Sequence, residues 1–158
     1  MLTVAKVIFQ LALGLWVGAV VVVSFLVAPA VFGAVPSETA GTVMGRVFPA
    51  YYAFTAGGGG VALLAALWIR RRTHGVGVST AVVAMLAVML GATIYAGAVV
   101  SPRARVLRPA LHVEPADPAV RAEFDGLHRR AVQLNGLVLL LGLAVVTATA
   151  RSARLPGE

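Results

Sequence analysis

The chain has 158 residues, of which 59% are hydrophobic and only 12% are charged. A soluble domain carries roughly 25% charged residues, so a soluble fold is excluded and a membrane protein is expected. The net charge of +7 arises from basic residues beside apolar segments, which favours anionic lipid headgroups in the bilayer as partners and argues against nucleic acid. The absence of cysteine excludes disulfides and thiolate chemistry.

Four windows reach the roughly 20 apolar residues that a membrane-spanning helix needs. They cover residues 7–28, 50–69, 78–100 and 131–150, and none contains Asp, Glu, Lys, Arg or His. No window alternates with period two, so helices are expected rather than barrel strands. We therefore predict an all-α integral membrane protein: one membrane domain over residues 1–158, with a four-transmembrane-helix bundle, a short interfacial helix after the first span and an extended fourth helix.

The first window resembles a signal peptide, with Lys6 before it and Ala28-Pro29-Ala30 after it. Its apolar run of about 22 residues exceeds the roughly 7–15 residues of a signal h-region. We therefore read it as a retained span.

Residues 36–48 are more polar than the windows on either side. Ser37 is a plausible N-cap, and Glu38 would lie in the first turn, where negative charge suits the helix dipole. Apolar residues then recur at helical spacing, which predicts a short interfacial helix leading into the second span.

Glycines mark the first two spans. Gly14 and Gly18 have GxxxG spacing, and residues 57–60 are four consecutive glycines. Such residues allow close helix packing in lipid, but the run of four also suits a hinge or a broken helix lining a cavity. A phosphate loop is excluded, because no Lys-Ser or Lys-Thr follows the glycines.

The polar loop over residues 101–130 contains four prolines, so it is not expected to be one helix. Asp117 followed by Pro118 is a helix-start signal. Nothing then interrupts a helix up to Ala150, a length of about 50 Å at 1.5 Å per residue. Because the hydrocarbon core is about 30 Å thick, this fourth helix should project beyond the membrane.

A polar stripe is predicted on this fourth helix. Steps of three and four place Arg121, Asp125, His128 and Asn135 on one face. Asn135 lies inside the fourth window and needs a polar partner, so the face should point into the bundle. Two interpretations stay open: the residues join helices at the mouth of the bundle, or they form a proton, ion or ligand site with His128 as the titratable group.

Metal and cofactor sites are not predicted. His112, Glu114 and His128 lie on one side and His74 on the other, but no HxH or HExxH spacing exists. No span contains a histidine that would serve as an axial haem ligand. We expect no metal and no cofactor, and an enzyme is not the favoured class.

The orientation follows from arginines near the membrane ends. Three of them, residues 70–72, lie in a short loop on the side of both termini, while those of the other side are spread over longer segments. Short basic loops favour the cytoplasm. We therefore expect a multi-pass protein of the cell membrane with both termini in the cytoplasm.

An ordered set of motifs resembles the transmembrane-protein-205-like family. They are Trp16-Val17-Gly18, Ala28-Pro29 with Phe32, the run from Gly45 to Tyr52, Ser101-Pro102-Arg103, and Phe124, Leu127-His128 and Asn135. The resemblance implies a four-span bundle without an established enzyme activity, and a eukaryotic relative is associated with platinum-drug resistance and vesicle traffic. It marks as motif positions Trp16, Pro29, Tyr51, Arg103, His128 and Asn135. Ala131 departs from the family pattern, where a small hydroxyl residue is expected.

Three functions compete at this point. The first is a small-solute or metal-complex transport or resistance protein, for which a homo-oligomer would help to enclose a path. The second is a non-catalytic accessory or scaffold subunit of a membrane complex. The third is a small membrane oxidoreductase that uses His128 with Asp125 and Arg103.

Overall fold

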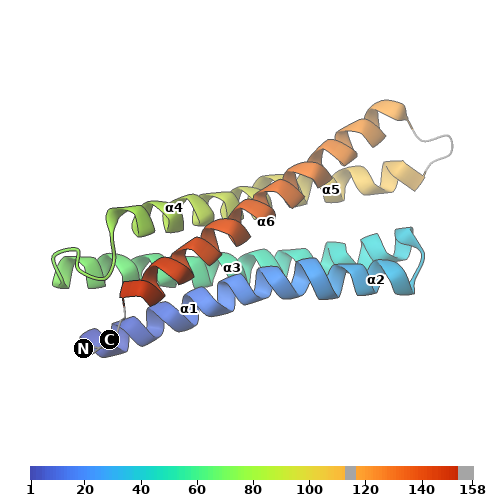
Figure 1. The fold of residues 1–158 in the computed structure, drawn as a ribbon. Helices are drawn as coiled ribbons and strands as arrows, with labels where there is room; N and C mark the ends of the chain where they lie inside the picture. Colours follow the sequence, from blue (N-terminus) through green and yellow to red (C-terminus); the bar gives the residue numbers. More distant parts are fainter. Residues whose placement is uncertain (113–116, 153–158) are drawn as a thin grey trace.

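The computed structural model describes residues 1–112 and 117–152, and these form four long helical rods (Figure 1). The first rod joins α1 (Leu2–Val22), the π-helical turn η1 (Val23–Val27) and α2 (Ala28–Ala34), and the second is α3 (Ser37–Arg72). The third joins α4 (Thr80–Tyr95), the π-helical turn η2 (Ala96–Val100), α5 (Ser101–Leu107) and the 3₁₀ turn η3 (Arg108–His112), and the fourth is α6 (Pro118–Ser152).

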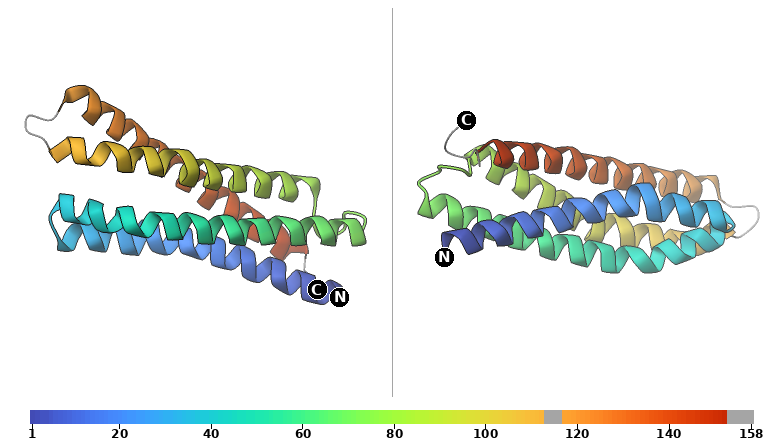
Figure 2. Two further views of the ribbon diagram at one scale, coloured as in Figure 1. Left: turned by 180° about the vertical axis from the view of Figure 1, so that it is seen from behind. Right: turned by 60° about the horizontal axis from the view of Figure 1, so that its bottom comes forward.

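The rods run antiparallel to their neighbours in chain order, and the fourth returns to pack on the first (Figure 2). The start of α1 and the end of α6 lie at one end of the bundle (Figure 1). All four rods are long and apolar enough to cross a membrane. The chain is therefore an all-α, multi-pass membrane protein with four apolar helices, as predicted.

The separate interfacial helix is a wrong prediction. Residues 37–48 are helical, but they form the first third of the unbroken α3, which contains Pro49. A proline removes one helical hydrogen bond, and in membrane helices neighbours can compensate for it. Ser37 is also not the N-cap, since Pro36 takes that position and gives no side-chain cap. Glu38 does lie in the first turn.

The predicted polar loop is largely helical. The third rod continues through α5 and η3 because Pro102 stands at the start of α5, where a missing N–H costs little. Asp117 caps α6 as predicted, with its carboxylate accepting the N–H of Ala119 at 2.8 Å. The long fourth helix is confirmed.

Two π-helical turns precede the prolines of the first and third rods. The N–H of Ala28 bonds to the carbonyl of Val23, and the N–H of Ser101 bonds to that of Ala96, each five residues back. Pro29 and Pro102 follow directly. Such wide turns alter the direction of a helix and recur at functional sites.

Of the four consecutive glycines of α3, Gly58 and Gly59 pack against α1, whereas a Cβ atom on Gly57 or Gly60 would meet nothing within 4 Å. α3 is a regular helix through residues 57–60, so the broken-helix alternative is wrong. A Cβ atom on Gly59 would lie 2.8 Å from the ring of Trp16, which is fully buried. A Cβ atom added to Gly14 or Gly18, by contrast, would meet nothing within 4 Å.

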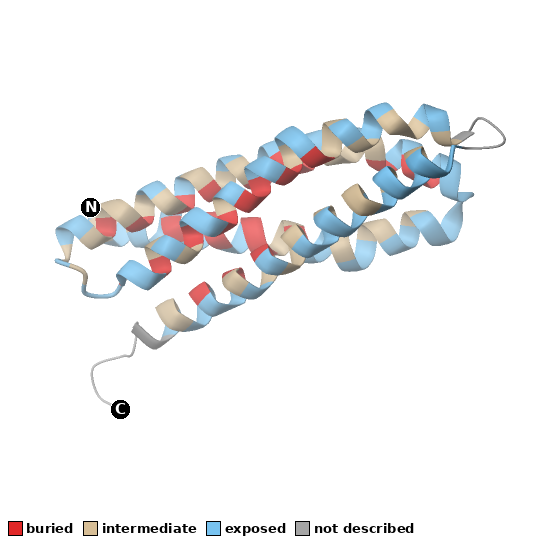
Figure 3. Cartoon of the chain, turned by 90° about the horizontal axis from the view of Figure 1, so that it is seen from above, coloured by how far each residue is buried: buried red, intermediate tan, exposed pale blue. Residues whose placement is uncertain are grey.

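Buried residues gather in the half of the bundle that holds the termini and at its middle (Figure 3). The opposite half, built from α2, the start of α3, α5 and the start of α6, has fewer of them; Ala40, Gly41 and Met44 are examples. We call the half with the termini, where buried side chains hold the helices together, the tight half of the bundle. We call the opposite half, where fewer side chains are buried, the loose half.

Candidate functional site

A cavity of about 470 Å³ lies in the loose half of the bundle. This volume falls within the roughly 300–1,000 Å³ of small-molecule sites. The first rod supplies residues from Val20 to Phe32, α3 supplies Gly45, Phe48 and Tyr52, and the third rod supplies residues from Val100 to Arg108. α6 completes the lining from Phe124 to Leu139. The cavity is therefore shared by all four rods.

The lining is apolar along most of its length and basic at one end. Arg105, Arg108 and His128 line the cavity, and no described Asp or Glu side chain does. The apolar part consists mainly of valine, leucine and phenylalanine side chains. Such a lining suits a molecule with an apolar body and a negatively charged head.

Arg108 is held against two other rods. Its guanidinium lies over α3 beside Gly41 and Gly45, where an added Cβ atom would be 3.1 Å from the guanidinium atoms. On its other side the guanidinium carbon is 6.0 Å from the centre of the Phe124 ring of α6, within the range of a cation–π contact. The two glycines, one helical turn apart, form the surface on which this half-buried side chain rests.

His128 belongs to the same end of the cavity as Arg108. It lies four residues after Phe124, and residues so spaced are neighbours on one helix face. His128 is exposed and lines the cavity. The contact between Arg108 and Phe124 therefore places the two basic groups near each other.

Asn135 lies deeper in the cavity and has the polar partner that the sequence required. Tyr51 donates its hydroxyl to the Asn135 side-chain oxygen at 3.2 Å. This hydrogen bond joins α3 to α6 at residues that belong to the apolar spans, where an unpaired amide would be costly. The other side of Asn135 borders the cavity.

The predicted polar stripe is only partly directed inward. Asp125 and Arg121 are exposed and do not line the cavity, and no hydrogen bond or ion pair joins Asp125 to His128. The inward face of α6 instead follows Phe124, Leu127 and Ala131. Two of the four predicted residues, His128 and Asn135, therefore line the cavity, and the apolar residues of α6 lie beside them.

The remaining predicted residues have different surroundings. Pro29 lines the cavity, whereas Arg103 forms an exposed ion pair with Glu123 at 2.7 Å. Trp16 packs in the tight half, and its indole N–H is buried without a hydrogen-bond partner among the described residues. The structure thus places His128, Asn135 and Pro29 along one cavity, with Tyr51 bonded to Asn135, and it places Arg103, Arg121, Asp125 and Trp16 elsewhere.

Arg105 and Arg108 were missed by the sequence reasoning. They were counted as loop charges, because residues 101–130 were read as a loop. A signal was present: Pro102 fits the first turn of a helix, and residues 105 and 108 are then three apart on one face. Phe124 was noted only as a motif residue.

The described residues contain no group of three or more His, Cys, Asp or Glu that could hold a metal ion. Glu114, one member of the set considered from the sequence, lies outside the described residues, as does the side chain of His112. The basic cavity end itself disfavours a free cation by repulsion.

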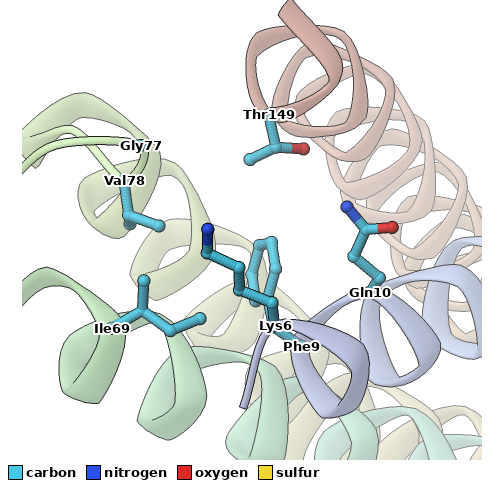
Figure 4. Close-up of a pocket in the computed structure, with 7 residues that line it drawn as sticks. All are labelled: Lys6, Phe9, Gln10, Ile69, Gly77, Val78 and Thr149. Atoms are coloured by element: carbon cyan, nitrogen blue, oxygen red, sulfur yellow. The ribbon is translucent and has the colours of Figure 1, made fainter. Parts of the chain in front are cut away.

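A second, much smaller cavity lies at the end of the bundle that holds the N-terminus. It measures about 80 Å³ and is bordered by Lys6, Gln10 and Thr149 (Figure 4). At about 30 Å³ for each water molecule, it has room for a few waters. It is too small for the ligands that the larger cavity can hold.

Comparison with known proteins gives one family. A domain of unknown function (DUF4149) matches residues 11–112, which cover most of the first three rods and include Arg105 and Arg108. No curated protein and no solved structure matches the chain. Because the match covers more than half of the sequence, this chain is a member of the DUF4149 family.

Proposed function

We propose that the protein binds an amphipathic anion in the large cavity and carries it across the membrane. The observation that supports this most is the lining: three basic side chains at one end, apolar side chains along the rest, and no described carboxylate. Charge-assisted hydrogen bonds to an anion are worth about 1.5–3 kcal/mol each, and arginine suits carboxylate, sulfonate and phosphate groups.

The basic end is what provides selectivity. An apolar tail that moves from lipid into an apolar cavity gains little, since lipid tails are as apolar as leucine. The head is different, because Arg105, Arg108 and His128 meet it where the apolar windows end. Ligands should therefore be sorted by charge first and by tail shape second.

This function narrows the transport hypothesis. An anionic solute fits the cavity better than a cationic metal complex does. The resemblance to the transmembrane-protein-205-like family, in which a eukaryotic relative is associated with platinum-drug resistance, supports transport as the general class of function. The cavity is in the half of the bundle away from the termini. With both termini on the cytoplasmic side of the cell membrane, the basic end of the cavity would therefore lie near the outer surface.

Transport can be measured in vesicles with a permanently charged reporter. We expect purified protein in neutral vesicles to speed the crossing of a fluorescent alkyl sulfonate, but not of an alkyl trimethylammonium of equal length. Crossing is followed by quenching of the reporter on the outer leaflet. Replacement of His128 with Ala should slow the sulfonate, because one of the three basic groups is lost.

Asp125→Ala is the matched control, since Asp125 is exposed on the same helix and does not line the cavity. It should transport like the wild type. Equal rates for the two reporters, or no rate above that of protein-free vesicles, would contradict the proposed function.

A further inference from the structure

The cavity is open on one side. Among the described residues, neither η1 nor α2 approaches α6 within 8 Å between Cα atoms, whereas α2 contacts α3, α3 contacts α5, and α5 contacts α6. The four elements thus form a trough with α3 and α5 as its floor and with α2 and α6 as its walls. The α5–α6 end diverges from the α2–α3 end in Figure 1 and in the left view of Figure 2, which looks from behind. We call the gap that separates η1 and α2 from α6 the slit.

The edges of the slit are apolar and exposed. Phe25 and Phe32 of the first rod are 61% and 48% exposed, Val132 of α6 is 57% exposed, and all three line the cavity. In a membrane-spanning bundle, exposed apolar side chains at this depth face lipid rather than water. The slit therefore connects the cavity to the plane of the bilayer.

The trough has the length of one lipid leaflet. Along α6 its lining extends from Phe124 to Leu139, and the part that runs from the basic His128 to the apolar Leu139 is about 16 Å long at 1.5 Å per residue. Half of the hydrocarbon core is about 15 Å. The basic end lies at the edge of the apolar window, where lipid headgroups are found, and the apolar end lies near the bilayer centre.

We propose that the cavity takes an acidic membrane lipid, which enters sideways through the slit. Its anionic head would lie between Arg105, Arg108 and His128, and an acyl chain would lie along the trough. The inference rests on the proposed function and names its ligand: a lipid of one leaflet with a phosphate or carboxylate head, rather than a water-soluble anion.

The test uses the full protein in nanodiscs of phosphatidylcholine with a trace of lipid that carries a photoreactive group on its acyl chain. We expect photoreactive phosphatidylglycerol to label Phe25 and Val132 more than Leu140, which is 69% exposed but does not line the cavity. Photoreactive phosphatidylcholine should show no such preference. The labelled residues are identified by mass spectrometry of peptides.

Two variants test the role of the head. Arg105→Gln should reduce labelling at the slit about fivefold, since a basic residue near the surface contributes about that factor for an acidic lipid. Arg121→Gln should leave labelling unchanged, because Arg121 is exposed on α6 outside the cavity lining. Equal labelling by the two lipids, or a loss in both variants, would overturn the inference.

Entry through the slit can be tested by attaching a bulky group to a single introduced cysteine, since the chain contains no cysteine of its own. A bulky maleimide attached to the Val132→Cys variant should abolish the preferential labelling of the slit by phosphatidylglycerol. The same group attached to the Leu140→Cys variant should leave that preference unchanged. Unchanged labelling with Val132 blocked would overturn the route. If an alkyl sulfonate binds in the cavity but no lipid labels it, the inference fails and the proposed function stands. If neither ligand binds, both fail.

Discussion

Replacement of Arg108 with Gln should lower the affinity for an amphipathic anion by about ten- to a hundredfold. The side chain is half-buried between Gly41, Gly45 and Phe124 and lines the cavity, so its charge reaches a bound head with little screening by water. Charge-assisted hydrogen bonds are worth about 1.5–3 kcal/mol, which corresponds to that change in affinity. The change in affinity is measured as the binding of an alkyl sulfonate to wild-type and variant protein in nanodiscs of neutral lipid.

The Arg108→Lys variant separates charge from packing. It keeps the positive charge but loses the planar group that rests on α3 and near Phe124, so it should retain part of the affinity. The unfolding temperature of each variant shows whether the bundle is intact. Wild-type affinity in a folded Arg108→Gln variant would mean that the anion binds elsewhere or that the cavity binds no anion.

Replacement of Gly59 with Ala should destabilise the bundle by about 1–3 kcal/mol, the usual cost of overpacking. The added methyl group would lie 2.8 Å from the ring of Trp16, which is fully buried. The ring or one of the two helices, α1 or α3, would have to shift to make room. Thermal unfolding in mild detergent, followed by circular dichroism, should show a loss of several degrees.

Gly60 offers a matched control in the same run of glycines. A Cβ atom there would meet nothing within 4 Å, and alanine is the better helix former. Gly60→Ala should therefore unfold at or above the wild-type temperature. If the two variants behave alike, the close approach of Trp16 to Gly59 does not stabilise the bundle.

The spans could be predicted because lipid imposes a simple rule on the sequence. A helix in hydrocarbon needs a long apolar run, and all four runs were visible. The Asp117 cap and the length of α6 also followed from local signals. The continuity of α3 did not, since Pro49 and the polar residues before it are typical of a helix boundary although the helix passes through them.

The site was harder to predict because its residues come from four rods. Asn135 was found, since a polar amide in an apolar window requires a partner, but only the structure identifies Tyr51 as that partner. Arg108 lies in a segment that was read as a loop, and its position depends on Gly41 of another helix. Local periodicity places residues on a face, but it does not tell which faces of different helices meet.

Native mass spectrometry of the wild-type protein, released from its membrane in mild detergent, tests most directly whether the cavity holds an amphipathic anion. The account predicts a bound species with the mass of an acidic, chain-bearing molecule, and its loss in Arg108→Gln but not in Arg121→Gln. A bound neutral lipid, cation or metal ion that persists equally in all three proteins would contradict it, as would an empty wild-type protein.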